Sequence, residues 1–407
     1  MEELKHSNEV HPGSIVLVTL ALLTLGLVVV ASATASLDRP MFAAPLWQSA
    51  FCRQAVFAAI GVAVMIIARY LSVGVLATSD RRARVSHVLF ALVLVCLVAA
   101  LVPSLADPHR GSQRWLQIAP LRAGIGFQPS EFAKLAMVGM LAALLTERKT
   151  SLRSFRGGFL PVAGAIGAYC LLVGKEDFGT AVLLGAIGVG MLFVAGCRIR
   201  HLFAMGLVGA CGFGALLVTA PYRLERLTAY QDIWADPKGA GYQPVQSLAT
   251  IASGGWWGTG LGGGVQKYGY LPESHSDFIF SVICEEMGML GGCLVIGLYC
   301  AFVWLGLRTM MAARTPFERI LAFGITATVG LQAAMNIAVV TVVTPTTGIS
   351  LPLISAGGSG VVTFCVASGV LAAIAARTRQ GSAALVGGLE GSDGAVRHVV
   401  PQEATAW

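Results

Sequence analysis

The chain has 407 residues, of which 56% are hydrophobic and only 12% are charged. This balance excludes an ordinary soluble domain and indicates a polytopic membrane protein. The net charge of +7 does not indicate a nucleic-acid-binding protein, because the arginines form small clusters between apolar segments and no single basic face.

Ten apolar runs approach the roughly 20 residues that a membrane-spanning helix needs. They begin near Ser14, Trp47, His87, Glu131, Phe159, Phe178, His201, Phe278, Phe317 and Ser359. The sequence therefore predicts an all-α fold in which residues 14–379 form one ten-helix membrane domain after a short segment at 1–13. The first run could instead be a signal peptide, since ASATAS at 31–36 offers small residues for cleavage. However, the run is longer than a typical signal-peptide core.

Arginine clusters set the predicted topology. They follow the second, fourth, sixth and eighth helices, at residues 81–84, 148–156, 198–200 and 308–319. Since cytoplasmic connections are rich in Lys and Arg, both termini are expected in the cytoplasm and the odd-numbered connections outside. The C-terminal tail, residues 380–407, is rich in Gly, Ser and Ala and is predicted to be a disordered cytoplasmic segment.

The nine cysteines lie in or beside apolar runs, and none lies between Pro221 and Asp277. Thiols in such surroundings behave as small hydrophobic side chains. We therefore expect neither a disulfide framework nor a zinc site.

A long outer connection, residues 221–277, joins the seventh and eighth predicted helices. Loops of this length tend to be functional or disordered, and the Trp, Tyr and Pro residues here argue against disorder. Segments such as YRLERLTAYQDIWAD are expected to form short amphipathic helices, with Trp234, Trp256 and Trp257 at headgroup depth. We expect this loop to fold over the outer face.

The end of this loop, YLPESHSDFIFSVICEEMG at 270–288, is rich in polar groups. It places His275 and Asp277 before an apolar helix, and Glu285 and Glu286 roughly two turns inside it. Carboxylates at membrane depth are costly, so these two are expected to face a cavity or a cationic partner. Two roles stay open for Asp277: a helix cap, because SHSD resembles a capping box, or a base or metal ligand.

The glycine-rich segment GGWWGTGLGGGVQK, residues 254–267, could bind phosphate, because glycine exposes backbone N–H groups and Lys267 adds a positive charge. It matches neither a Walker A loop nor a dinucleotide fingerprint. On its own the segment favours a flexible surface or re-entrant loop beside the membrane.

Polar groups also lie around the start of the fourth predicted helix, in GSQRWLQIAPLRAGIGFQPSEFAKLA. Arg114 and Trp115 are placed outside, where they suit anionic headgroups and a sugar face. Glu131 and Lys134, one turn apart, are expected to form an internal pair.

Two further connections carry motifs. KEDFGT places Asp177 in a tight outer turn, where it could cap the next helix. TPTTGISLPLISAGGSG, residues 344–360, has no charge, and its prolines and glycines break a span. It is either an ordinary loop or a broken segment that lines the same cavity as Asp277.

Taken together, GSQRWL, FQPSEFAK, DFGT, GYQPVQS, LPESHSDFIF with its EEMG, and TGISLPLISAGGSG resemble the signature segments of the SEDS family, the shape, elongation, division and sporulation proteins. The resemblance runs in order from about Ser14 to Arg377. WADP at 234–237 and VQKYGYLPESHSDF at 265–278 are closer to the FtsW/SpoVE branch than to the RodA branch. Two departures are the missing proline before Asp177 and the missing aromatic residue after Ser355.

The resemblance implies a peptidoglycan glycosyltransferase that polymerises lipid II at the outer face of the bacterial cytoplasmic membrane, in cell division or elongation. It implies that Asp277 is the essential acid, that Trp115 is functionally important, and that Glu131, Lys134 and Asp177 hold structural or cavity positions. The implied partners are a class B penicillin-binding protein, the division or elongation machinery and membrane lipids.

The chemistry of the residues agrees with this function. Transfer from a lipid pyrophosphate needs a base for the acceptor hydroxyl, which Asp277 can supply, and positive charge for the leaving pyrophosphate. We expect single displacement with inversion, because a glycosidase would typically show two cooperating carboxylates. The residues expected to bind substrate are Arg114, Trp115, Gln266, Lys267, His275 and Ser355. A divalent ion, Mg²⁺ or Mn²⁺, is expected to be held jointly by Asp277 and the pyrophosphate.

Two other functions stay open. A lipid II flippase or another transporter would also place polar groups in a membrane cavity, but along an alternating path. A noncatalytic scaffold for a division transpeptidase would leave Asp277 dispensable. The location of the polar groups distinguishes a transporter from an enzyme, since a transferase needs them at one interface.

Overall fold

The computed structural model describes residues 10–34, 49–76, 78–100, 116–117, 126–147, 152, 154–175, 177–218, 221–265 and 270–396. Within these residues ten apolar helices form a bundle: α2 (Pro12–Thr34), α3 (Ala50–Leu76), α4 (Ser79–Ala100), α5 (Pro129–Glu147), α6 (Leu160–Gly174), α7 (Phe178–Val194), α8 (Ile199–Val218), α11 (Ile279–Ala312), α12 (Pro316–Val340) and α13 (Gly358–Val396). Eight segments are long and apolar enough to cross a membrane, while the apolar stretches of α7 and α8 are shorter. The predicted all-α, ten-helix fold is confirmed.

Apolar runs locate these helices well because burial and lipid exposure both require apolar side chains. Nine of the ten begin within three residues of the predicted start. The exception is α4, which begins at Ser79 and not near His87. Its first turns contain Arg81, Arg82 and Arg84, and arginine is a good helix former that lies outside any apolar window.

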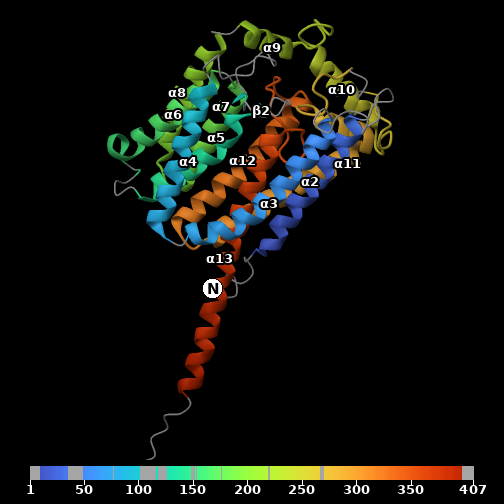
Figure 1. Cartoon of the computed structure of the whole chain (residues 1–407). Coiled ribbons are helices and arrows are strands. Elements are labelled where there is room, and N and C mark those ends of the chain that lie inside the picture. Colours follow the sequence, from blue (N-terminus) through green and yellow to red (C-terminus); the bar gives the residue numbers. More distant parts are fainter. Residues whose placement is uncertain are drawn as a thin grey trace, which may run out of the picture.

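The core lies where α5 and α12 meet α7 and α13, with α13 packed along α3 and α11 along α12. Leu183 and Ile187 on α7 and Ile325 and Val329 on α12 have no exposed surface. At the edge of the bundle, α4 and α8 expose many apolar side chains, as a surface in contact with lipid tails requires. Figure 1 shows α13 passing through the bundle and projecting from one end.

Helical structure in α13 continues to Val396, although the sequence predicted a disordered tail from residue 380. The chain has no proline between Pro352 and Pro401. Backbone hydrogen bonding can therefore continue from the buried part of α13 into a segment whose composition alone does not favour a packed structure.

The outer loop forms two further helices, α9 (Pro221–Gln231) and α10 (Tyr242–Gly254), which lie across the end of the bundle opposite the projecting part of α13 (Figure 1). The predicted amphipathic helices and the folding of the loop over one face are thereby confirmed. α10 is fastened by Ser247, whose hydroxyl lies 2.8 Å from Ser281 Oγ on α11 and 2.7 Å from the carbonyl of Val340 on α12.

Two short elements complete the connections. Strand β1 (Leu116–Gln117) pairs antiparallel with β2 (Gly126–Phe127) before α5, and Leu116 faces Phe127 in this register. A π-helical turn, η2 (Phe155–Phe159), leads into α6. All nine cysteines are free thiols, as predicted.

Helix α11 is broken at Gly288, whose φ of 67° and ψ of −168° are essentially restricted to glycine. The break separates two carbonyls, those of Glu285 and Glu286, from the N–H groups of Met289 and Leu290 that a continuous helix would give them. All four groups bond instead to main-chain atoms of residues 255–260: Met289 N to Gly255 O at 2.9 Å, Leu290 N to Trp256 O at 3.5 Å, Thr259 N to Glu285 O at 2.9 Å, and Gly260 N to Glu286 O at 3.0 Å. The outer loop is thus inserted into α11 and satisfies these four main-chain groups at the break.

Candidate active site

Between α12 and α13 the chain folds back into the bundle. Leu351, Leu353 and Ile354 are at most 1% exposed. Gly26 of α2 makes room for this segment, because a Cβ atom there would lie 2.7 Å from the Cα of Ile354. Leu353 adopts a left-handed φ of 66°, which is uncommon for a residue with a side chain. Residues 344–357 are therefore a re-entrant segment and not an ordinary connecting loop.

The re-entrant segment and α12 hold the main chain that carries Asp277. Three successive carbonyls each accept a hydrogen bond from a different donor. The donors are the Ala356 N–H to His275 O at 2.9 Å, the Ser355 hydroxyl to Ser276 O at 2.6 Å, and the Asn336 amide to Asp277 O at 2.8 Å. The predicted proximity of residues 344–360 to Asp277 is confirmed, and Asp277 itself is half-buried.

The N-cap position of α11 is not Asp277, as a capping box that starts the helix at this residue would require. The helix begins at Ile279, its N-cap residue is Phe278, and no side chain caps it. The residues before it form a series of turns in which Ser276 N and Phe278 N both donate to the carbonyl of Glu273. These turns occupy the positions where a capping box would have started the helix.

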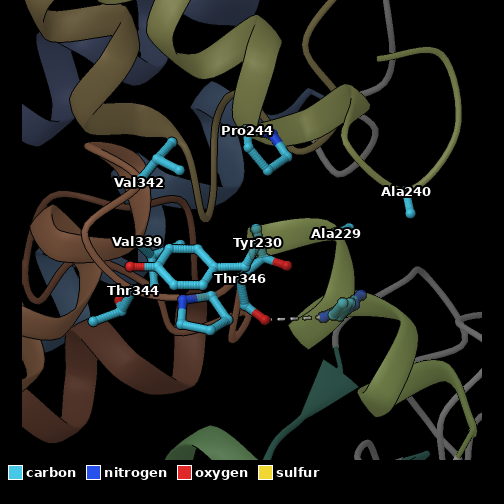
Figure 2. A pocket seen from close by; sticks show the side chains of 10 residues that line it. Ala229, Tyr230, Ala240, Pro244, Val339, Val342, Thr344 and Thr346 are labelled. Atoms are coloured by element: carbon cyan, nitrogen blue, oxygen red, sulfur yellow. Dashed lines mark hydrogen bonds between the residues drawn. The ribbon is translucent and has the colours of Figure 1, made fainter. Parts of the chain in front are cut away.

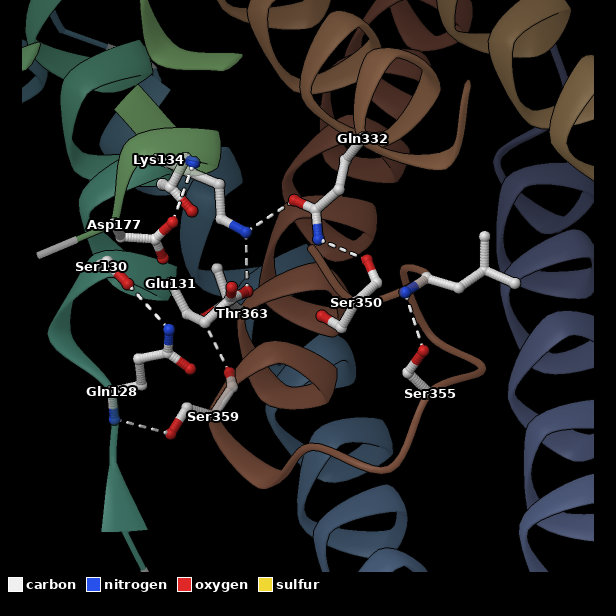
Figure 3. Close-up of polar contacts among 12 residues, drawn as sticks. Gln128, Ser130, Glu131, Lys134, Asp177, Gln332, Ser350, Ser355, Ser359 and Thr363 are labelled. Carbon is white, nitrogen blue, oxygen red and sulfur yellow. Dashed lines mark hydrogen bonds and ion pairs between the residues drawn. The ribbon is translucent and has the colours of Figure 1, made fainter. Parts of the chain in front are cut away.

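A buried polar network lies beside this segment (Figure 3). Lys134 is 1% exposed, and its Nζ donates to Glu131 Oε2 at 2.8 Å and to Gln332 Oε1 at 2.6 Å. Gln332 in turn donates to the carbonyl of Ser350 at 2.9 Å. The predicted pair of Glu131 and Lys134 is confirmed, and it connects α5 to α12 and to the re-entrant segment.

Asp177 caps α7, as predicted. Its Oδ1 accepts a hydrogen bond from Thr180 N at 3.0 Å, and the residue is 3% exposed. An acceptor at this position satisfies one of the free N–H groups in the first turn of a helix.

Glu285 and Glu286 are each 2% exposed, and both accept hydrogen bonds from the glycine-rich segment. Val265 N donates to Glu285 at 2.9 Å. Glu286 Oε1 accepts from Gly262 N at 3.2 Å and from the hydroxyl of Ser32 on α2 at 2.7 Å. Because these N–H groups already serve the protein's own carboxylates, residues 254–265 do not form the open phosphate cradle that their glycines had suggested.

The structure describes two of the six residues that are expected to bind substrate, His275 and Ser355. Arg114, Trp115, Gln266 and Lys267 lie outside the described residues. His275 is half-buried beside Asp277. Ser355 is 3% exposed, and its oxygen accepts from Leu351 N at 2.7 Å while its hydroxyl donates to Ser276 O. This arrangement favours holding the chain in place over direct contact with substrate.

Sequence reasoning missed Gln54, Gln332 and Asn336, three buried amides that tie helices to the re-entrant segment. Gln54 donates to the carbonyl of Ser355 and accepts from Gly357 N, each at 3.2 Å. Gln332 and Asn336 are four residues apart on one face of an apolar helix. That spacing of two amides at membrane depth was the available signal.

These groups lie at one end of the bundle. Glu131, Asp177 and Asp277 lie at or before the starts of α5, α7 and α11, while Gln332 and Asn336 lie in the last turns of α12. Because neighbouring spans run in opposite directions, these helix ends meet under α9 and α10 (Figure 1). Within the described residues, no group of three or more His, Cys, Asp or Glu side chains could form a preformed metal centre.

A shallow pocket lies further out, between α9, α10 and the turn after α12 (Figure 2). The hydroxyl of Tyr230 donates to the carbonyl of Val343 at 2.6 Å, and the guanidinium of Arg226 donates to the carbonyl of Thr346 at 3.4 Å. Its cavity volume of about 10 Å³ is far below the roughly 300–1,000 Å³ of most ligand sites. The hydrogen bonds of Tyr230 and Arg226 fasten α9 to the bundle, and the pocket is too small to be the site for a large lipid.

Comparison with known proteins agrees with the motifs. Residues 13–380 match the FtsW, RodA and SpoVE family of cell cycle proteins. Stage V sporulation protein E of Bacillus subtilis is 38% identical over 363 residues, which cover 88% of this chain and 94% of that protein. A probable peptidoglycan glycosyltransferase FtsW of Nitrosococcus halophilus is 38% identical over 367 residues, covering 88% and 90%.

Solved structures share the fold. One chain comes from a structure described as the structural coordination of polymerization and crosslinking by a peptidoglycan synthase complex. It has a TM-score of 0.70 and 25% identity, covering 90% of this chain and 98% of that one. The crystal structure of the rod shape determining protein RodA of Thermus thermophilus has a TM-score of 0.62 and 23% identity, covering 89% and 95%. With a family match over nearly the whole bundle and relatives that align from end to end, this chain belongs to the FtsW, RodA and SpoVE family.

Proposed function

We propose that this protein is a peptidoglycan glycosyltransferase that polymerises lipid II into glycan strands at the outer face of the bacterial cytoplasmic membrane. One observation carries the proposal. A half-buried carboxylate, Asp277, lies at the end of a membrane bundle on a main-chain segment whose three successive carbonyls are held by separate donors. A base that must meet a sugar hydroxyl at the membrane surface needs this combination of access and fixed position.

The reaction is a single displacement. Asp277 removes the proton from the acceptor hydroxyl, whose oxygen attacks the anomeric carbon of the donor sugar. The new carbon–oxygen bond forms as the bond to the pyrophosphate breaks, and undecaprenyl pyrophosphate leaves with the electron pair. Attack from the opposite face inverts the anomeric configuration, and the proton on Asp277 passes to water before the next cycle.

The leaving pyrophosphate needs positive charge. Arg114 and Lys267 are the proposed cations, with Trp115 against a sugar face and Gln266 and His275 as further polar contacts. A divalent Mg²⁺ or Mn²⁺ ion held by Asp277 and the pyrophosphate would supply the same neutralisation, and its other ligands would be substrate and water oxygens. Undiminished polymerisation by the purified enzyme in excess chelator would exclude the ion.

The arginine clusters support an outward-facing site. Arg81, Arg82 and Arg84 begin α4, Arg198 and Arg200 begin α8, and Arg308, Arg314 and Arg319 flank the junction of α11 and α12. All lie at the end of the bundle opposite Asp277. By the positive-inside rule this end is cytoplasmic, and so are both termini.

The same geometry weighs against a transporter. The polar groups cluster at one end, whereas the other end is packed around Glu318, which has no exposed surface and lies 2.9 Å from Arg377. An alternating path would need polar groups along the bundle. A solved structure that resembles this chain belongs to a peptidoglycan synthase complex, which supports a class B penicillin-binding protein as partner, within the division or elongation machinery.

Asp277→Asn is the sharpest test, because it keeps the shape of the side chain and removes the base. We expect loss of polymerisation of purified lipid II with unchanged thermal stability. Asp232→Asn, which alters an exposed carboxylate in the same outer loop, is the matched control and should remain active. Near-normal glycan synthesis by Asp277→Asn would overturn the assignment of Asp277 as the base, whereas a purified wild-type protein that makes no glycan would favour the scaffold.

A further inference from the structure

Asn336 joins two segments that are far apart in the sequence. It lies in the last turns of α12, is 1% exposed, and has an amide nitrogen 2.8 Å from the carbonyl of Asp277 and 2.7 Å from that of Ile349. Since a side-chain amide has two N–H groups, both are used. One buried side chain therefore clips the main chain of Asp277 to the re-entrant segment.

The carbonyl of Asp277 does not accept the bond that the N–H four residues later would give it in a regular helix. In a regular helix the N–H of Ser281 would bond to the carbonyl four residues earlier, that of Asp277. Here the N–H of Ser281 bonds to the carbonyl of Phe278 at 3.0 Å. Asn336 supplies the hydrogen bond that the helix leaves unmade.

The two preceding carbonyls are held by the re-entrant segment, through Ser355 and Ala356. Asn336 differs from these donors because it belongs to a membrane-spanning helix of the core. Its neighbour on the same face, Gln332, is fixed by Lys134. Thus the main chain of Asp277 is held by a helix of the packed bundle, and not only by neighbouring loops.

We propose that Asn336 is a positioning residue for glycosyl transfer: it fixes the main chain of Asp277 so that the carboxylate meets the acceptor hydroxyl in reactive geometry. The inference rests on the proposed function, in which Asp277 is the base. Asn336 touches the main chain of the base and not the substrate. Its loss therefore lowers kcat and leaves KM for lipid II nearly unchanged, because a displacement of about 1 Å can cost 10²-fold in rate.

The test uses the purified full-length protein and lipid II. Asn336→Ala removes both donors, and we expect kcat to fall about 10- to 100-fold with KM changed less than about threefold. Hydrogen–deuterium exchange should become faster at residues 276–281. Ser355→Ala removes the donor to the neighbouring carbonyl from a different element and should show the same pattern, so the test survives if one variant folds poorly.

Thr341→Val is the matched control on α12. Its hydroxyl bonds to the carbonyl of Ile337 within the same helix, so kcat and exchange at 276–281 should match the wild type. The inference is wrong if Asn336→Ala and Ser355→Ala keep wild-type kcat. It is also wrong if kcat falls only in proportion to the fraction of folded protein, which would mark Asn336 as purely structural.

Failure of the inference can be told apart from failure of the proposed function. If Asp277→Asn is inactive while Asn336→Ala is fully active, the base stands and the positioning role falls. If Asp277→Asn polymerises normally, Asp277 is not the base and the catalytic role of Asn336 falls with it, whereas a wild-type protein that does not polymerise lipid II would overturn the proposed function itself. In either case hydrogen–deuterium exchange at residues 276–281 shows only whether Asn336 holds this part of the main chain in place.

Discussion

At the scale of single residues, the bundle places charged and amide groups where water does not reach and gives them hydrogen-bond partners within the protein, although Glu285 Oε2 and Asn336 Oδ1 are buried without one. Lys134 shows this best, because its ammonium group has both Glu131 and Gln332 within hydrogen-bond distance and lies 5.0 Å from the centre of the Phe364 ring. Such a pair contributes modest net stability when intact. Breaking it is costly, since one charge is left without a partner.

Replacing Lys134 by Met should therefore destabilise the protein by about 3–5 kcal/mol. The expected readout is a lower thermal unfolding temperature of the purified protein. A second variant, with Lys134→Met and Glu131→Gln together, removes the stranded carboxylate and should recover part of the loss. A Lys134→Met protein as stable as the wild type would show that the pair carries no buried charge.

Sequence reasoning was most successful for residues whose partners are close along the chain. The Glu131–Lys134 pair and the Asp177 cap are three-residue relationships, and both were predicted. Glu285 and Glu286 were recognised as unusual, but their acceptance of N–H groups from residues 262–265 was not foreseen. Those bonds depend on how a long loop returns to α11, which no local spacing specifies.

At the scale of elements, α11 and the outer loop form one hydrogen-bonded unit. The sequence predicted a capping box before α11, but the chain forms a series of turns there. It also predicted one continuous helix, but α11 is broken at Gly288. Both differences have the same cause. Donors and acceptors from residues 255–260 and from the re-entrant segment compete successfully with the local hydrogen bonds of the helix.

Gly288→Ala tests this unit. A Cβ at this position would lie 2.4 Å from the carbonyl oxygen of Trp256, and the backbone conformation is closed to alanine. We expect the inserted loop to be expelled, with faster hydrogen–deuterium exchange at residues 255–260 and reduced polymerisation. Gly297→Ala, at a helical position with open space around it, should leave both measurements unchanged. Normal exchange in the Gly288 variant would contradict the insertion.

At the scale of the whole molecule, the number of spans and their approximate starts follow from apolar runs, whereas the sidedness stays a proposal that rests on the arginine clusters. The grouping of the polar residues at the starts of α5, α7 and α11 and at the end of α12 does not follow from either. It required the positions of Gln332 and Asn336, whose partners lie on other elements. The substrate residues at 114–115 and 266–267 stay predictions.

Sidedness can be measured on intact cells with a thiol reagent that does not cross the membrane. Lys238→Cys, in the outer loop, should react, and Arg314→Cys, between α11 and α12, should react only after lysis; both positions are exposed. Native Cys197 adds little background, because burial raises the pKa of its thiol and so lowers the thiolate fraction at neutral pH. Labelling of Arg314→Cys in intact cells would reverse the proposed orientation.

The break at Gly288 also bears on the length of α11. A helix of 34 residues measures about 51 Å, far more than the roughly 30 Å thickness of the hydrocarbon core. The part from Met289 to Ala312 measures about 36 Å and is sufficient to cross the membrane alone. The turns that carry Glu285 and Glu286 are therefore surplus to the crossing. Glu285 and Glu286 therefore need not lie at the depth of the hydrocarbon core for α11 to span the membrane.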